Sequence, residues 1–324
     1  MASPSPHTPP IKTLLFAPVW FFQLFTTAKS FRDNPLLGNR RLNKLGLHAG
    51  RLVLAHYIMR FRMALLGFGV DAPDRAAYQR DGFLAKENYI PAEQFARIEA
   101  EIRAFQGNAR VTQQGDTQTR RVLLDPETLQ QLPHTRQWLE DRTFRRLLRY
   151  TAGHSRLPFF NIEEISNGIY ASNDHDPQKD LHTDTFHPTM KFWLYLDDVD
   201  EHNGPFTYIP TSAQLTRQRL RWEYQYSQTA RHAPELYSAR GSFRLHAPDL
   251  AQLGLPAPKA FRVKKNTLLI ANTFGVHGRG QADPGSTRLS LWGMSRTNPF
   301  IPFPGFGLEV FNRLQYRILK VIKA

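Results

Sequence analysis

The 324-residue chain contains no cysteine, which excludes disulfides, thiolate nucleophiles, zinc ribbons and iron–sulfur ligation. Any metal ion would therefore be bound by histidine and carboxylate side chains. The uncharged, aromatic-rich run over residues 13–28 is shorter than the roughly 20 apolar residues that a spanning helix needs. An apolar fraction of 41% with 22% charged residues is typical of a globular protein and excludes a disordered chain.

Acidic residues are scarce relative to basic ones, 28 against 42, which gives a net charge of +14. Half of this excess lies in residues 1–75, where ten Lys and Arg face three acids. Such a charge indicates an anionic partner, namely nucleic acid, an anionic membrane surface or an acidic substrate. Because the basic residues lie among apolar helices and not on a strand platform with interleaved aromatics, nucleic acid is disfavoured.

The first 75 residues have the pattern of a basic helical extension rich in aromatic residues. The run over residues 13–28 contains Pro18, where we expect a bend, and the aromatic residues Trp20, Phe21, Phe22 and Phe25. Residues 42–66 predict one or two helices, with Leu52, Ala55, Met59, Met63 and Leu66 on one stripe and arginines elsewhere. Residues 11–66 thus resemble an interfacial anchor for an anionic membrane surface. The alternative is that these helices pack on the main domain with their arginines solvated.

Helical patterns precede strand patterns along the rest of the chain. After a boundary at residues 67–73, Pro91 begins an amphipathic helix with apolar residues at 95, 98, 102 and 105. Short strands are predicted at 157–162, 168–172, 190–196, 206–209, 265–271 and 289–294. This order predicts an α+β protein with a barrel or jelly roll. We expect an extension (1–75), a main domain (76–300) and a basic C-terminal helix (301–324).

Two histidines and an aspartate form a candidate metal site. His182 and Asp184 are separated by one residue, so in an extended segment both side chains project to the same side. His277 follows the apolar run 268–270 and is next to Gly278, which suits a third ligand at the end of a buried strand. Two imidazoles and one carboxylate match the ligand set of non-haem Fe(II) oxygenases, which leaves positions open for a cosubstrate and O₂.

Three further residues suit a carboxylate-binding site beside this metal. Arg288 follows His277 after an Asp-Pro-Gly-Ser turn, and a hairpin there would return its guanidinium to the metal. A guanidinium binds a carboxylate through two hydrogen bonds, and Ser290 on the same face can donate another. Trp193 lies in a strand that ends at Asn203-Gly204-Pro205 and can form a wall of the site.

From Tyr78 to about Asn298 these motifs resemble the phytanoyl-CoA dioxygenase family of Fe(II)/2-oxoglutarate oxygenases. The resemblance implies a double-stranded β-helix, a jelly-roll or cupin-like barrel, with flanking helices. It implies that His182, Asp184 and His277 are catalytic and bind Fe(II), and that Arg288, Ser290 and Trp193 hold 2-oxoglutarate. O₂ would be the second cosubstrate and ascorbate a supporting reductant. The family often has Pro-Gly-Ser-His after the Asn-Gly-Pro strand, whereas this chain has Pro-Thr-Ser-Ala at 210–213.

The resemblance predicts a hydroxylase that attacks an unactivated C–H bond of a small or lipid-like anionic substrate and releases succinate and CO₂. Related halogenases have a small residue in place of the carboxylate ligand, so Asp184 favours hydroxylation. The alternative is a non-catalytic barrel that binds an acidic ligand or nucleic acid. The need for 2-oxoglutarate predicts a cytoplasmic location, at the inner face of a membrane if residues 11–66 are an anchor. We expect His175, His187 and His202 at the surface, outside the metal site.

Overall fold

The computed structural model describes residues 10–171 and 174–305, with side chains from residue 16 onward. Its helices are α1 (Pro10–Gln23), α2 (Arg40–Lys44), α3 (Leu47–Leu66), α4 (Ala72–Asp81), α5 (Ala92–Ala104), α6 (Pro126–Gln130), α7 (Pro133–Leu139), α8 (Arg142–Ala152), α9 (Arg217–Ser227), α10 (Leu236–Ala239) and α11 (Ala247–Leu253). Its strands are β1 (Phe83–Lys86), β2 (Arg110–Gln114), β3 (Thr117–Leu123), β4 (Phe159–Ser166), β5 (Met190–Tyr195), β6 (Phe206–Tyr208), β7 (Lys259–Ala260), β8 (Leu268–Asn272), β9 (His277–Arg279) and β10 (Thr287–Ser295).

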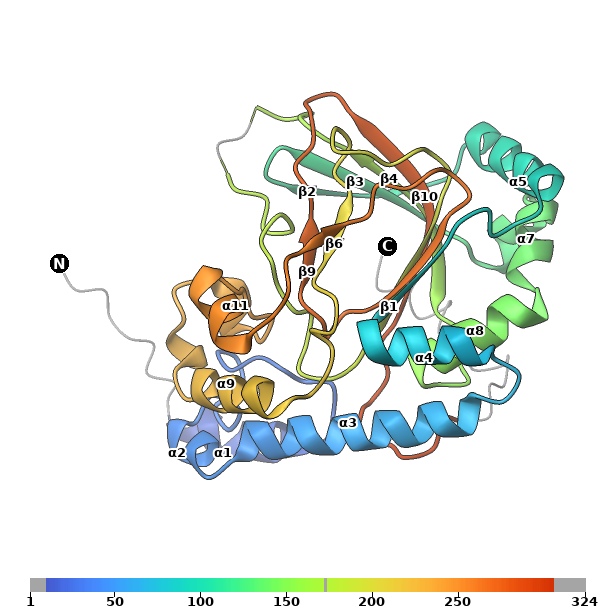
Figure 1. Cartoon of the computed structure of the whole chain (residues 1–324). Coiled ribbons are helices and arrows are strands. Elements are labelled where there is room, and N and C mark those ends of the chain that lie inside the picture. Colours follow the sequence, from blue (N-terminus) through green and yellow to red (C-terminus); the bar gives the residue numbers. More distant parts are fainter. Residues whose placement is uncertain (1–9, 172–173, 306–324) are drawn as a thin grey trace.

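Two antiparallel sheets form the barrel at the centre of Figure 1. The larger sheet has the strand order β1-β8-β5-β10-β4-β3-β2, and the smaller has the order β7-β6-β9. Several neighbouring strands, such as β8 and β5 or β10 and β4, come from distant parts of the sequence, as in a jelly roll. The fold is therefore α+β, with a double-stranded β-helix flanked by helices, as the sequence predicts.

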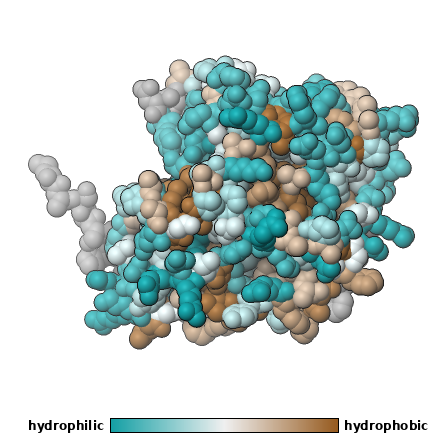
Figure 2. Space-filling model, in the orientation of Figure 1, coloured by the Kyte–Doolittle hydropathy of each residue, from teal (hydrophilic) through white to brown (hydrophobic). Residues whose placement is uncertain are grey.

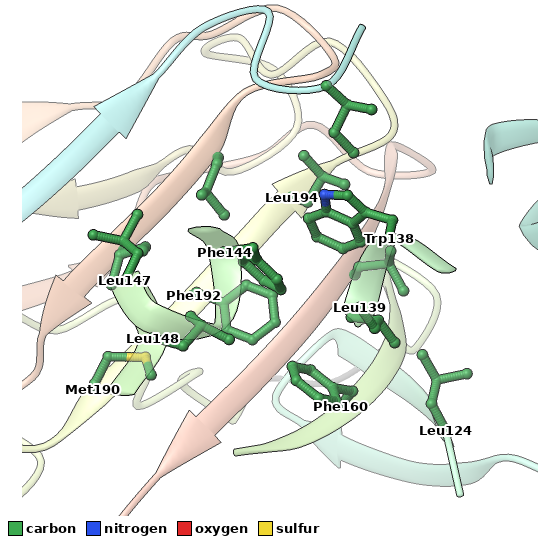
Figure 3. Packing of buried hydrophobic residues seen from close by; sticks show 14 of the residues in the cluster. Leu124, Trp138, Leu139, Phe144, Leu147, Leu148, Phe160, Met190, Phe192 and Leu194 are labelled. Carbon is green, nitrogen blue, oxygen red and sulfur yellow. The ribbon is translucent and has the colours of Figure 1, made fainter. Parts of the chain in front are cut away.

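Alternation along β5 gives the larger sheet one face toward the helices and one toward the barrel interior. Phe192 and Leu194 pack with Trp138 of α7 and Phe144 of α8 (Figure 3). The intervening residues of β5 face the smaller sheet. Trp193 and Tyr195 join Phe206 and Tyr208 of β6 in a second apolar cluster. The two sheets thus enclose an aromatic interior, and the helices cover the outside of the larger sheet (Figure 1).

The N-terminal helices lie along one side of the molecule, where α3 packs against α8 and α9 (Figure 1). Leu52, Ala55, Met59 and Met63 are buried, as the predicted stripe requires. The expectation that the arginines of this region are all solvated is wrong, because Arg51 and Arg62 are buried. Arg51 donates to the carbonyls of Leu24, Thr26 and Ala28, and Arg62 donates to those of Asn298 and Ile301. Backbone carbonyls thus accept the hydrogen bonds that water would accept from these guanidinium groups in solution.

Most of the helices and strands predicted from the sequence are present in the structure, and a few are not. The helix after Pro91 and five of the six predicted strands are present within a few residues of their predicted bounds. No strand forms over residues 168–171. Helix α1 continues through Pro18. The predicted C-terminal helix lies outside the described residues, apart from its first few positions, which are not helical. No helix in the described part of the chain has the length and apolar character needed to cross a bilayer.

Acid should weaken the packing of α3 through His56, which is buried with its ring centroid 4.4 Å from that of Phe274. Burial lowers the pKa of His56 to about 4, against 6.5 ordinarily. His56 is therefore protonated below about pH 6.5 in the unfolded chain, but only below about pH 4 in the folded protein. The free energy of unfolding thus decreases as the pH falls from about 6.5 to about 4. We expect the free energy of unfolding to drop by about 2 kcal/mol more between pH 7.5 and 5 in the native chain than in His56→Phe. Urea unfolding at both pH values measures this, and equal losses in the two chains would contradict it.

Candidate active site

Two distant segments bring His182 and His277 side by side. Residue 182 lies in the loop that precedes β5, and His277 begins β9 of the smaller sheet. Each backbone N–H donates to the carbonyl of the other residue, at 2.8 and 2.9 Å, and the ring centroids are 4.5 Å apart. Both residues are buried, at 2% and 3% exposure. The sheet register therefore fixes the two imidazoles as neighbours within the barrel.

Backbone carbonyls orient both imidazole rings. Nδ1 of His182 lies 2.7 Å from the carbonyl oxygen of Asp180, and Nδ1 of His277 lies 2.9 Å from that of Gly275. A carbonyl only accepts, so we infer that each Nδ1 carries the proton and each Nε2 presents a lone pair. Burial and the neighbouring His277 lower the pKa of His182 well below its usual value. A neutral imidazole with a free Nε2 is the form that binds a metal ion.

The carboxylate of Asp184 faces both free nitrogens. Its Oδ1 lies 3.7 Å from Nε2 of His182 and 3.6 Å from Nε2 of His277. Ligand atoms of the three residues all lie within 4.8 Å of one another, and they are the one such group in the described part of the chain. Two ligands held about 2.1 Å from one ion lie at most ~4.2 Å apart, so both measured separations suit a shared ion. The buried Nε2 of His277 has no hydrogen-bond partner among the described residues, as expected of a ligand atom.

Lys191 fixes the charge and orientation of Asp184. Its Nζ lies 2.7 Å from Oδ2, which leaves Oδ1 toward the histidines. Desolvation would raise the pKa of Asp184, but Lys191 and the two imidazoles hold it well below its usual range. The carboxylate is therefore ionised, and one of its oxygens is already engaged. The arrangement suits a monodentate ligand to a divalent cation.

Arg288, Ser290 and Trp193 all lie in the central strands of the larger sheet. Ser290 of β10 is opposite Tyr195 of β5, and Trp193 is opposite Trp292. Since alternate residues share a face, Arg288 and Ser290 lie on the same inner side as Trp292. Trp193 packs on Phe206 at 4.6 Å between ring centroids. The ring of Phe206 in turn lies 5.6 Å from that of His277, which connects this face to the candidate metal-ligating group of His182, Asp184 and His277.

Arg288 and the neighbouring Tyr195 each have a buried polar atom without a hydrogen-bond acceptor among the described residues. The guanidinium donates to the carbonyl of Gly204 and lies 5.7 Å from the ring centroid of Tyr195. Nε of Arg288 and the hydroxyl of Tyr195 have no hydrogen-bond partner among the described residues. Burial raises the pKa of Tyr195 to about 12, so its hydroxyl keeps its proton and can donate. Donors without acceptors in a buried site suit a carboxylate ligand such as that of 2-oxoglutarate.

Sequence reasoning missed Lys191, Tyr195 and Lys29. The first two occupy positions two residues on either side of Trp193, so strand alternation around that tryptophan could have identified both. Lys29 donates to the backbone carbonyl of Asp184 from the N-terminal extension. No sequence pattern places residue 29 there, because the contact depends on how α1 and the turn after it pack.

The other histidines differ in exposure. The side chains of His175 and His202 are mainly exposed and pair with Asp180 and Asp283, as predicted for surface residues. The same prediction is wrong for His187, which is 1% exposed. Its ring packs against Phe186 at 4.9 Å between centroids, which explains its burial. His187 is not one of the three residues whose ligand atoms converge.

Comparisons with known proteins find one family and many solved structures. The family model described as phytanoyl-CoA dioxygenase matches residues 78–251, more than half of the chain. No curated protein sequence matches. Similar solved structures include the epimerase SnoN in complex with Fe3+, alpha ketoglutarate and nogalamycin RO, at 17% identity over 71% of this chain and 83% of that one, with a TM-score of 0.48. HygX from Streptomyces hygroscopicus with nickel and 2-oxoglutarate is 15% identical over 70% and 87%, with a TM-score of 0.46.

Proposed function

The chain belongs to the phytanoyl-CoA dioxygenase family of Fe(II)- and 2-oxoglutarate-dependent oxygenases, and from this premise we propose a hydroxylase whose ferrous ion is bound by His182, Asp184 and His277. It acts on an unactivated C–H bond and releases succinate and CO₂. The observation that carries the proposal is the convergence of two Nε2 atoms and one carboxylate oxygen, with Nε2 of His277 lacking a hydrogen-bond partner among the described residues.

The residues of the site have separate tasks in this proposal. When bound, the ferrous ion and 2-oxoglutarate supply the oxidising power that O₂ requires to attack a C–H bond. Lys191 keeps Asp184 ionised and holds its second oxygen away from the imidazoles. Arg288, Tyr195 and Ser290 bind the distal carboxylate of the cosubstrate. Trp193 and Phe206 line the space between this carboxylate site and His277 and exclude water.

A screen for succinate release tests the activity. The native chain is incubated with Fe(II), 2-oxoglutarate and ascorbate, together with candidate lipids, amino acids and acyl thioesters. We expect iron-dependent succinate formation that one class of compound accelerates, with the hydroxylated product identified by mass spectrometry. Absence of both metal binding and succinate formation in the native chain would overturn the proposal.

Substrate and location are proposed from the outer face of the N-terminal helices. Large apolar side chains that are 49–94% exposed occur on α3 and just after it, at Leu54, Tyr57, Phe61, Leu65 and Phe68. Most are three or four residues apart, so they form a stripe opposite the buried one. The exposed Phe21, Phe22 and Phe25 belong to α1 and the turn after it. Together these residues are the aromatic face; apolar patches also occur along the lower edge of Figure 2, where α3 runs.

Exposed cations accompany the aromatic face. Arg40, Arg41, Lys44 and Arg60 are exposed on α2 and α3. Aromatic residues beside basic ones are typical of helices that lie in the interface of an anionic membrane. We propose that the protein works at the cytoplasmic surface of a membrane on a lipid-like, anionic substrate. No described helix spans a bilayer, so the contact proposed is peripheral.

Introducing negative charges into the aromatic face should strongly weaken membrane binding. We expect Phe22→Glu/Phe61→Glu to sediment with vesicles of anionic phospholipid at least ~30-fold more weakly than the native chain, since each phenylalanine loses roughly 1.5–3 kcal/mol of apolar burial. Val111→Glu, a substitution at a 51% exposed residue of β2, is the matched control and should bind as the native chain does. A native chain that fails to bind the vesicles would favour the alternative in which the extension only packs on the barrel.

A further inference from the structure

A cavity of about 560 Å³ lies between the N-terminal segment and the end of the barrel. The N-terminal segment supplies most of its lining, from Trp20 to Asn34, and the remaining lining residues are Arg240 and Arg296. Arg240 follows α10 and Arg296 follows β10. The family match begins at residue 78, so most of this wall belongs to a part of the chain that the family does not describe.

Three cations and one acid line the cavity: Lys29, Arg240, Arg296 and Asp33. Arg240 lies 3.6 Å from Asp33, which partly balances that pair. Lys29 and Arg296 form no ion pair with a carboxylate among the described residues; each donates to a backbone carbonyl instead. The cavity thus has an excess of positive charge that an anion would neutralise.

Lys29 connects the cavity to the metal-ligating group. It lines the cavity, and its ammonium group donates to the backbone carbonyl of Asp184. An ammonium group has three donors, so two remain for another acceptor. An anionic group bound to Lys29 would therefore lie close to the backbone of Asp184.

The segment that presents Lys29 is held in place by the buried Arg51 and by the exposed Arg296. Arg51 donates to three carbonyls between Leu24 and Ala28, and its guanidinium lies 4.3 Å from the ring centroid of Phe186. Arg296 donates to the carbonyl of Thr27 at 3.1 Å. At Gly241 a β-carbon would overlap the carbonyl of Lys29, so the close approach of the two segments requires glycine. The cavity wall is thus a built part of the fold.

We propose that this cavity binds the anionic group of the substrate, a phosphate or a carboxylate, with Lys29 and Arg296 as its donors. The inference rests on the proposed hydroxylase and specifies its substrate class. Trp20 offers an apolar wall beside these donors, which suits an anion attached to a hydrocarbon chain. The N-terminal extension is then part of the active site as well as a membrane contact.

Calorimetry on the full chain loaded with Mn(II) and 2-oxoglutarate tests the proposal with octyl phosphate, octanoate and inorganic phosphate. We expect octyl phosphate or octanoate to bind the native chain, and Lys29→Gln and Arg296→Gln each to weaken this binding about tenfold or more. Arg296→Lys keeps the charge and should recover part of the loss. Arg217→Gln removes an exposed cation on α9 outside the cavity lining and should bind as the native chain does. Inorganic phosphate that binds as tightly as octyl phosphate would identify a soluble ester in place of a lipid.

The outcomes separate this proposal from the proposed function. Mn(II) and 2-oxoglutarate affinities are measured in every variant, and both should stay within about twofold of native in Arg296→Gln, whose side chain does not contact Asp184. If the native chain binds Mn(II) and 2-oxoglutarate but none of the three anions, the cavity proposal is overturned and the hydroxylase remains. Equal anion binding by the native chain and both glutamine variants overturns it as well. Thermal unfolding of each variant identifies any loss that comes from misfolding.

Discussion

Replacing Asp184 with asparagine should abolish Mn(II) binding and iron-dependent succinate release. The substitution keeps the size of the side chain but removes the charge that faces Nε2 of His182 and of His277 at 3.7 and 3.6 Å. It also leaves Lys191 without the carboxylate that it contacts at 2.7 Å, so the charge of the ammonium group next to the metal position is no longer neutralised. Loss of the ligand charge together with repulsion by Lys191 should weaken Mn(II) binding at least ~100-fold.

The histidine ligands permit an independent measurement. His277→Ala removes the nitrogen that lacks a hydrogen-bond partner, and should lose Mn(II) binding and succinate release to a similar degree. His202→Gln removes an exposed imidazole that pairs with Asp283, and should leave both unchanged. Calorimetry with Mn(II) gives the affinity, and the rise in melting temperature on adding Mn(II) gives a second readout, since a bound ion stabilises the folded state. Native-like binding in Asp184→Asn and His277→Ala would show that the ligands are wrongly assigned.

The metal-ligating group was predictable because its information is local. His182 and Asp184 share a side of an extended segment, and His277 follows a buried apolar run, so each half of the site is visible in a few residues. What joins the halves is the bridge between residues 182 and 277. The family resemblance implied that the two halves share one metal ion, but it did not predict this bridge, since spacing alone does not determine which strands of a barrel become neighbours.

The packing of the N-terminal extension on the barrel was not predictable in detail, because it depends on buried polar contacts between distant segments. Arginines in a basic helix usually lie in water, yet Arg51 is buried against carbonyls of residues 24–28. That contact in turn places Lys29 at Asp184. His187 was misassigned for a related reason, since its burial comes from packing beside Phe186 and not from its own polar sequence context. Tertiary contacts of this kind leave no periodic signal in the sequence.

Arg288→Gln should weaken 2-oxoglutarate binding at least ~100-fold while changing Mn(II) affinity by less than about threefold. A buried guanidinium binds a carboxylate through two charge-assisted hydrogen bonds, each contributing roughly 1.5–3 kcal/mol. Arg288 is 4% exposed, and its Nε has no hydrogen-bond partner among the described residues. A bound carboxylate would therefore satisfy this nitrogen, and glutamine could not replace that contact. Calorimetric titration of 2-oxoglutarate into the Mn(II)-loaded chain measures the loss, and the KM for 2-oxoglutarate in the succinate assay should rise in parallel.

Graded substitutions distinguish a carboxylate clamp from a merely structural arginine. Arg288→Lys keeps the charge but cannot form the fork, so it should bind 2-oxoglutarate with an intermediate affinity. Tyr195→Phe removes one neutral donor and should cost about tenfold or less, because a neutral hydrogen bond contributes about 1 kcal/mol. Arg97→Gln, at an exposed cation of α5, should match the native chain. If Mn(II) affinity fell before 2-oxoglutarate affinity in Arg288→Gln, the arginine would support the metal site and the carboxylate would have to bind elsewhere.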